Sequence, residues 1–434
     1  MAGQKVFVRI GVAAVPVGEL IVDAQPGDRE TSIFTYDPTW VARTNAFALS
    51  PHMPLGLTPF YTNKGTQGSS LPAPIADGAP DSWGRAIIKL ALGGRVTSDL
   101  DYLIQSDDFL RSGALRYFDG PGPDAKALAP PDGGKLGVSI PRLLDLEQVI
   151  AEARAFEADP IHYRENRAKM IGGGALERAV GSLGGARPKV NAQAEDGALW
   201  IVKLAKMDDQ YAIARAEVMA LRLASRVGIS AATADVLPSS QRFPVAIVKR
   251  FDRDAKGARI PFISAQTFMG LPGANPGNYV DVAFQMHAWS RDPVSDMAEL
   301  YRRMMYNVLI QNTDDHLRNL GFLYRGAGKW GLSPAYDVNP VPEMNTTLKT
   351  AISETHGNGL NIEKVIEAAP YFEIKVDDAT MMASKMATII KAEWRDIGGK
   401  LGMTASDFKA IAPAMENDQI EAAIALGQPA DNLP

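Results

Sequence analysis

The stretch N-T-D-D-H-L-R-N, residues 312–319, follows an apolar helical pattern and is crowded with polar side chains. Asp314 and Asn319 stand five residues apart in it. An aspartate followed at that spacing by an asparagine is the arrangement of a phosphoryl-transfer loop. The aspartate accepts or orients a hydroxyl proton, and the asparagine offers a neutral oxygen to Mg²⁺, which prefers hard oxygen ligands. The alternative is a solvated loop that ends a helix, with Asn319 as its C-cap.

A second carboxylate follows after one predicted β-hairpin. Asp337 lies in L-S-P-A-Y-D-V-N-P, residues 332–340, directly behind a strand pair with a Gly-Ala-Gly turn. We therefore predict that Asp314 is the catalytic residue and that Asn319 and Asp337 hold the metal.

The other polar residues of the loop carry weaker signals. His316 is one of five histidines, and the chain has no histidine pair at helical spacing, so we do not expect a zinc site. We expect the imidazole of His316 to brace the loop. For Asp315 and Arg318 we expect solvated side chains.

A glycine-rich stretch lies upstream, immediately before a predicted strand. G-S-L-G-G-A-R-P-K, residues 181–189, contains Ser182 between glycines, followed by Gly184 and Gly185. Successive backbone N–H groups in such a loop can cradle phosphate oxygens. The alternative is an ordinary flexible turn.

A lysine inside an apolar strand is the next signal. Lys203 lies in L-W-I-V-K-L-A and is costly to bury unless it is paired. In kinases, such a lysine grips the nucleotide phosphates and is held by a helix carboxylate, here Glu217. The alternative for Lys203 is an edge-strand side chain that reaches water. A later strand ends at 248–251, where a backbone hinge would bind adenine.

The order of these parts predicts the fold class. Short alternating strands fill the first hundred residues, strands and helices mix in the next block, and helices dominate from about residue 275. We predict an α+β, bilobal protein-kinase-like fold with a β-rich N-terminal subdomain and a mostly helical C-terminal lobe. The expected domains are 1–115, 116–253 and 254–434.

Composition narrows the class of protein. The net charge of −5 gives no bulk reason to bind nucleic acid or an anionic membrane. The chain has no cysteine, which excludes disulfides and favours a reducing compartment. It also has no signal-peptide pattern and no apolar run near the roughly 20 residues that span a bilayer. We expect a cytoplasmic protein.

Together, these motifs resemble the HipA family of bacterial serine/threonine kinases, the toxin partners of type II toxin–antitoxin modules. The resemblance rests on 181–189, W-I-V-K-L-A-K at 200–206, A-E-V-M-A-L-R-L-A-S-R-V-G-I at 216–229, V-K-R-F-D-R at 248–253, and the two segments quoted first. The N-terminal runs V-G-E-L, F-T-Y-D, A-L-S-P-H-M-P-L and A-P-D-S-W-G-R-A-I-I also follow that family's order.

The resemblance implies an ATP- and Mg²⁺-dependent enzyme that autophosphorylates at Ser182 and is silenced by that modification. It implies that Asp314 is the catalytic base and that Glu217 orients the lysine. The implied ATP-binding residues are Ser182, Gly184, Gly185, Lys203, Val248, Lys249, Phe251, His316, Asn319 and Asp337. Lys249 stands where the family often has an acidic residue.

The implied partners are a small HipB-like helix-turn-helix antitoxin and, through it, operator DNA. The implied substrate is a translation component such as an aminoacyl-tRNA synthetase. Two alternatives stay open: a kinase-like corepressor that binds without turnover, and a small-molecule phosphotransferase. Members of the latter class usually carry a histidine before the aspartate, whereas His316 follows Asp314.

Overall fold

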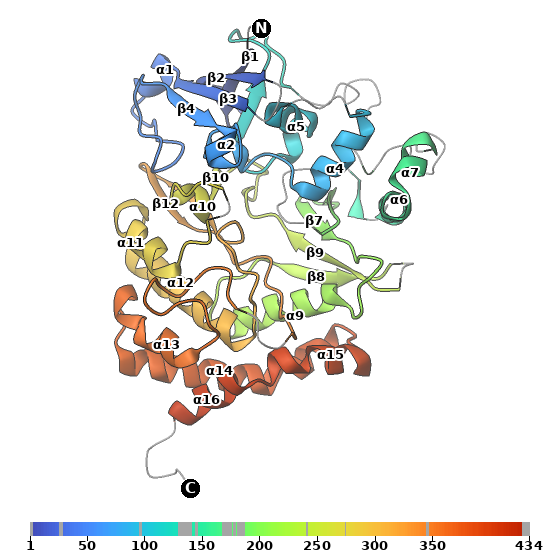
Figure 1. Ribbon diagram of the computed structural model, residues 1–434, viewed down its shortest axis with the longest axis vertical. Helices are drawn as coiled ribbons and strands as arrows, with labels where there is room; N and C mark the ends of the chain where they lie inside the picture. The colour runs from blue at the N-terminus through green and yellow to red at the C-terminus, as the bar shows by residue number, and fades with distance from the viewer. Residues whose placement is uncertain are drawn as a thin grey trace. The chain divides into compact units, whose positions relative to one another are not determined.

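The computed structural model is an α+β structure, as the sequence predicts (Figure 1). Its strands concentrate in the N-terminal half and its long helices in the C-terminal half. The residues that the structure describes are 3–25, 29–94, 98–128, 141–143, 146–166, 176, 179, 187–239, 242–273, 275–343 and 347–427. No helix among them is both long and apolar enough to cross a membrane.

The chain groups into two compact units, each built from two segments. Unit 1 comprises Met1–Met207 and Lys249–Asn275, and unit 2 comprises Asp208–Val248 and Pro276–Pro434. The three-domain division expected from the sequence stays a prediction.

Unit 1 holds most of the strands and several short helices. Its elements are β1 (Gln4–Ile10), β2 (Val15–Gln25), β3 (Arg29–Tyr36), α1 (Pro38–Val41), β4 (Phe60–Asn63), α2 (Lys64–Gln67), α3 (Ala73–Ala76), α4 (Ser82–Ala91), α5 (Asp99–Gln105), η1 (Asp108–Leu110), β5 (Leu115–Phe118), α6 (Leu146–Ala158), α7 (Pro160–Asn166), β6 (Lys189–Gln193), β7 (Leu199–Lys203), β10 (Phe262–Ser264) and α10 (Ala265–Phe268).

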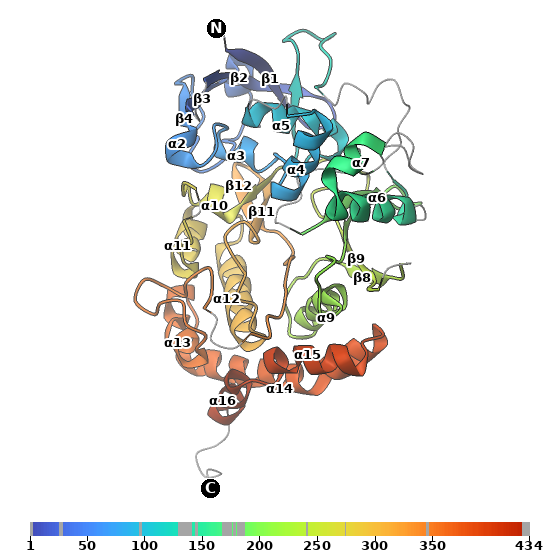
Figure 2. The ribbon, with the colours of Figure 1, turned by 45° about the vertical axis from the view of Figure 1, so that its right-hand side comes forward.

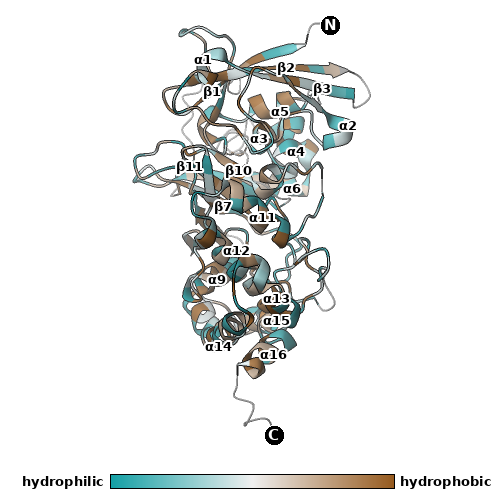
Figure 3. Ribbon diagram, turned by 90° about the vertical axis from the view of Figure 1, so that its left-hand side faces the viewer, coloured by the Kyte–Doolittle hydropathy of each residue, from teal (hydrophilic) through white to brown (hydrophobic). Residues whose placement is uncertain are grey.

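An antiparallel sheet in the order β4-β3-β2-β1-β5 forms the N-terminal part of unit 1. Strand β3 alternates strictly, with Glu30, Ser32, Phe34 and Tyr36 buried and the intervening residues partly exposed. That period of two is why R-E-T-S-I-F-T-Y forms a strand with one face on a core. Strands β1 to β3 accordingly show both teal and brown along their length in Figure 3.

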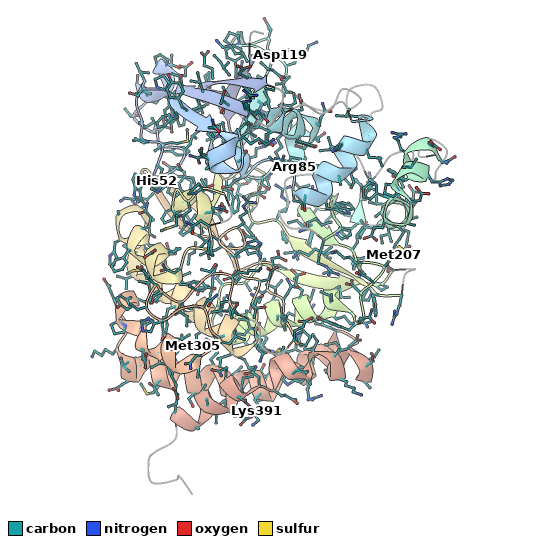
Figure 4. The ribbon with its side chains drawn as sticks, viewed as in Figure 1. His52, Arg85, Asp119, Met207, Met305 and Lys391 are labelled. Carbon is teal, nitrogen blue, oxygen red and sulfur yellow. The ribbon has the colours of Figure 1, made fainter. Side chains whose placement is uncertain are left out.

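Ionic side chains lie under this sheet and tie the short helices to it. The Asp99 carboxylate, at the start of α5, accepts from Arg85 Nη1 at 2.7 Å and from the Ser70 N–H at 2.9 Å. The Asp99 N–H donates to Glu30 of β3, and Lys64 Nζ lies 3.3 Å from the same carboxylate of Glu30. Burial acts to raise the pKa of Asp99, but these donors hold the pKa below its ordinary value. Arg85 is labelled in Figure 4.

A second buried network binds the returning segment 249–275 to the rest of unit 1. The carboxylate of Asp252 accepts from both Arg250 Nη2 and Arg253 Nη1 at 2.7 Å and from the Gly113 N–H at 2.8 Å. Arg250 Nη1 also donates to the carbonyl of Leu110 at 2.6 Å. Residues about 140 positions apart in sequence are thereby joined in one core.

Unit 2 is mostly helical. Its elements are α9 (Ile213–Arg226), β8 (Ala234–Leu237), β9 (Val245–Lys249, whose last residue falls in unit 1), α11 (Tyr279–Trp289), α12 (Pro293–Leu309), β11 (Gly321–Gly326), β12 (Lys329–Leu332), α13 (Ile362–Glu367), η4 (Ala369–Phe372), α14 (Val376–Lys400), α15 (Ala405–Met415) and α16 (Asp418–Leu426).

Helix α12 runs through the core of unit 2. It begins after Asp292, whose side chain accepts from the Ser295 N–H, with Pro293 at the first helical position. Its residues Met304 and Met305 are fully buried. Helix α14, 25 residues long, packs against α9, α13, α15 and α16. Figure 2 shows α14 beside α15 and α16.

Changing Asp252 to asparagine should destabilise unit 1. The variant leaves two buried guanidinium groups without their carboxylate. The free energy of unfolding at pH 7 should therefore fall by about 3–5 kcal/mol. Although burial opposes it, the pKa of Asp252 is held well below its ordinary value of 3.8, chiefly by Arg250 and Arg253. The stabilisation is therefore complete above pH 3.8 and is lost as the pH falls through the folded-state pKa, so the difference from wild type narrows in acid.

Calorimetry or urea unfolding from pH 7 down to about pH 3 measures this difference. Asp254→Asn is the matched control, because Asp254 is exposed and uses only an Oδ1 acceptor that asparagine retains. Equal stability of the two variants at pH 7 would contradict the prediction.

Candidate active site

The loop 312–319 leaves the end of helix α12 in a defined direction. The chain turns at Gln311, whose φ of 51° is in the left-handed region. Directly after it, the N–H of Asn312 donates to the carbonyl of Asn307 at 2.8 Å. Asn307 and Asn312 are both buried, so the start of the loop is anchored inside the core of unit 2.

Asp314 and Asn319 are joined across the loop. The carbonyl of Asp314 accepts from the His316 N–H at 2.8 Å and from Asn319 Nδ2 at 3.2 Å. Asn319 is buried, whereas Asp314 is exposed. An exposed carboxylate on an anchored backbone can accept a proton from a hydroxyl that approaches it. Because Asn319 uses its nitrogen within the loop, its Oδ1 is the atom suited to a metal.

Asp337 is brought to the same loop by the segment that follows β12. Tyr336 Oη donates to the carbonyl of Arg318 at 2.7 Å. Asp337 itself has a φ of 56°, uncommon for a residue with a Cβ, and its Oδ1 accepts from Asn339 Nδ2 at 3.1 Å. The structure therefore brings together the segments that carry Asp314, Asn319 and Asp337, while the roles of these residues stay predictions.

The donor set of this loop fits Mg²⁺ better than a transition metal. One carboxylate and one amide oxygen are hard ligands, and Mg²⁺ takes few protein ligands when phosphates and water supply the others. The described part of the chain contains no group of three or more His, Cys, Asp or Glu side chains that could hold a metal alone. Asn319 and Asp337 are the residues that would hold Mg²⁺.

Asp315 is not solvated, and our expectation for it was wrong. Its Oδ2 accepts from the hydroxyl of Tyr279, the first residue of α11, and from Asn307 Nδ2 at 2.8 Å. Burial raises the pKa of Asp315 above its ordinary value, although the Tyr279 hydroxyl and the charge of Arg303 act in the opposite direction. Burial and the neighbouring carboxylate also raise the pKa of Tyr279 well above 10. The reason is tertiary: α11 closes over the side of the loop that carries Asp315.

His316 and Arg318 differ in their surroundings. His316 is half-buried, and its Nδ1 has no hydrogen-bond partner among the described residues. The expected bracing by the imidazole is therefore not seen at Nδ1, and the bond within the turn comes from the backbone N–H instead. The predicted contact of His316 with ATP stays a prediction. Arg318 is exposed, as expected.

The remaining predicted residues of unit 1 occupy strand ends. Lys203 is the last residue of β7, half-buried, and pairs in register with Lys189 of β6. Lys249 is exposed at the end of β9. The Phe251 ring lies 6.2 Å from that of Phe262. Their roles in binding ATP stay predictions.

In unit 2, Glu217 is buried on α9 and Val248 is buried on β9. Their roles stay predictions. Ser182, Gly184 and Gly185 lie outside the described residues.

Sequence reasoning missed the polar residues that support the loop, namely Tyr279, Asn307, Asn312 and Asn339. One signal was available for Asn307. It is a single amide within the apolar run M-M-Y-N-V-L-I, and a buried amide requires partners. The amides of Asn312 and Asn339 stand beside the predicted site residues but have no periodic signature.

Two family models match the chain. The HipA N-terminal domain matches residues 8–115, and the HipA-like C-terminal domain matches residues 181–394. A HipA chain from Shewanella oneidensis, solved with HipB and its operator DNA, is similar in fold: the TM-score is 0.67 at 16% identity, over 96% of each chain.

Curated relatives match over shorter stretches. A Sinorhizobium fredii protein named "Putative kinase Y4dM" is 36% identical over 21% of this chain and 22% of its own length. "Toxin YjjJ" of Escherichia coli is 25% identical over 47% of each. The chain thus spans less than half the length of the curated relatives it matches. The two domain models and the shared fold nevertheless agree along the chain, which therefore belongs to the HipA family.

Proposed function

We propose that this protein is a serine/threonine protein kinase that transfers the γ-phosphoryl group of ATP to a protein hydroxyl. One observation carries the proposal. In a HipA-family chain, the structure joins an exposed aspartate, a buried asparagine five residues later and a second aspartate beyond the next hairpin. This is the set that phosphoryl transfer uses, because such catalysis rests on positioning and charge stabilisation.

Each residue then has a defined task. Asp314 orients the acceptor hydroxyl and takes its proton. Asn319 and Asp337 hold Mg²⁺, which, when bound, neutralises charge on the phosphates. In this proposal Lys203 contacts the phosphates and Glu217 orients that lysine. The chain at Val248, Lys249 and Phe251 binds adenine, and Gly184 and Gly185 cover the phosphates.

The printed names of relatives support the biological setting. One relative is named a kinase and another a toxin, and the similar HipA structure contains HipB and operator DNA. We propose that this chain is likewise a toxin neutralised by a helix-turn-helix antitoxin. Its protein substrate would be a translation component such as an aminoacyl-tRNA synthetase.

Replacing Asp314 with asparagine should lower the rate of phosphate transfer by about 100- to 10,000-fold, the usual contribution of a positioned base. Folding should be unaffected, because the Asp314 carboxylate is exposed and asparagine has the same shape. Phosphoproteomics after brief expression of wild type and variant measures the loss. Asp378→Asn, an exposed aspartate in the first turn of α14, is the control and should behave like wild type.

Phosphate on no cellular protein in the wild-type culture would refute the kinase proposal. Growth arrest that persists undiminished in Asp314→Asn would instead favour a corepressor that acts by binding.

Ser182 should become phosphorylated when the purified protein is incubated with ATP and Mg²⁺. The modification adds about −1.5 to −2 charges where the ATP phosphates would lie, so it should reduce activity. Intact mass and peptide mapping measure the phosphate, and Ser182→Ala should remain unmodified and active for longer. A wild-type protein that phosphorylates other proteins but stays unmodified itself would contradict the predicted autophosphorylation and leave the kinase proposal intact.

A further inference from the structure

Behind the proposed catalytic loop, side-chain amides form a continuous hydrogen-bonded network. Asn307, in the last turn of α12, donates from Nδ2 to the Asp315 carboxylate and, at 3.1 Å, to the Tyr279 hydroxyl. Its Oδ1 accepts from Asn312 Nδ2 at 2.9 Å. Asn307 and Asn312 are 4% and 1% exposed, so these partners replace water almost completely.

The network continues from the loop to the segment that carries Asp337. The backbone N–H of Asn339 donates to Asn312 Oδ1 at 3.3 Å. The side chain of Asn339 then donates from Nδ2 to Asp337 Oδ1 at 3.1 Å. We call Asn307, Asn312 and Asn339 the asparagine network. It leads without a break from Asp315, next to the proposed base, to Asp337.

The amide orientations follow from partners whose chemistry is unambiguous. A backbone N–H only donates, so the atom of Asn312 that faces Asn339 is Oδ1 and the other atom is Nδ2. That Nδ2 requires an acceptor, so Asn307 presents Oδ1 to it. The remaining Nδ2 of Asn307 then faces the Asp315 carboxylate, which accepts. Every bond has one donor and one acceptor.

We infer that Asn339 and Asn312 are positioning residues that hold the Asp337 carboxylate in the orientation that binds Mg²⁺. This inference rests on the proposed function, in which Asp337 is a metal ligand. Asp337 is half-buried with a φ of 56°, and its carboxylate is hydrogen-bonded by the side chain of Asn339, two residues further along the chain. The Asn339 bond to Oδ1 restricts the rotation of the carboxylate and so the directions in which Oδ2 can point.

The same bonds couple the two halves of the metal site. Asn312 binds the Asp337 segment through the Asn339 N–H. It is also the first residue of the loop that contains Asn319. Partners behind metal ligands typically change metal affinity by about 10- to 100-fold when removed. Asparagine is suited to this position because one amide both accepts from backbone and donates to another side chain.

The test is a direct titration of the full chain with Mn²⁺, followed by electron paramagnetic resonance, in the presence of a non-hydrolysable ATP analogue. Asn339→Ala removes the donor to Asp337 but keeps the backbone N–H that binds Asn312. Its affinity for Mn²⁺ should fall by about 10- to 100-fold. Asn339→Asp, which sets a second carboxylate against Asp337 Oδ1, should bind with altered affinity and an altered spectrum.

The control is Asn361→Ala, which removes the N-cap of α13 in the same unit. It should lower the melting temperature without changing the Mn²⁺ affinity, and so separates positioning from general stability. If wild type binds Mn²⁺ with the nucleotide and Asn339→Ala binds it equally well, this inference is overturned and the proposed function stands. If wild type itself takes up no Mn²⁺, both this inference and the proposed function are overturned.

Discussion

The amide of Asn307 projects from helix α12 into the core of unit 2, where each of its polar atoms has to find a partner. A buried amide left unpaired costs about 1–3 kcal/mol, more than a typical hydrogen bond contributes. Asn307 meets this constraint with Tyr279 of α11, Asp315 of the loop and Asn312 at the start of the loop. One buried side chain thus links helices α11 and α12 to the loop 312–319.

The exposure of Asp314 follows from that anchoring. Its neighbour Asp315 is held inward by Tyr279 and Asn307, whereas the side chain of Asp314 is exposed. Two consecutive aspartates therefore receive different environments. Asp314 remains accessible to a substrate, while Asp315 has a raised pKa and a structural task. The division depends on what packs against each carboxylate, since their intrinsic chemistry is the same.

The core of unit 1 also contains buried polar groups that need partners, and there the partners are charged. Its core contains the guanidinium groups of Arg111, Arg250 and Arg253, with Asp252 and Asp108 as carboxylate partners. Backbone carbonyls accept several of the remaining donors, including that of Leu110 from Arg250. Burial lowers the pKa of Arg253 to about 10. This value is still well above 7, so the guanidinium group remains charged at neutral pH. These bonds hold two distant segments of the chain in one unit, at the cost of making the core sensitive to the loss of a single carboxylate.

The amino-acid sequence by itself determined the α+β class and the concentration of strands in the first part of the chain and of helices in the last part. These follow from local periodicity, caps, turns and short spacings, all of which can be read along the chain. The inward turn of Asp315, the support from Tyr279 and the asparagine network were decided only by the tertiary structure. Their partners lie up to 36 residues apart and belong to different elements, so no local pattern records them. Burial and hydrogen-bond partners, which separate Asp314 from Asp315, exist only once those elements have packed.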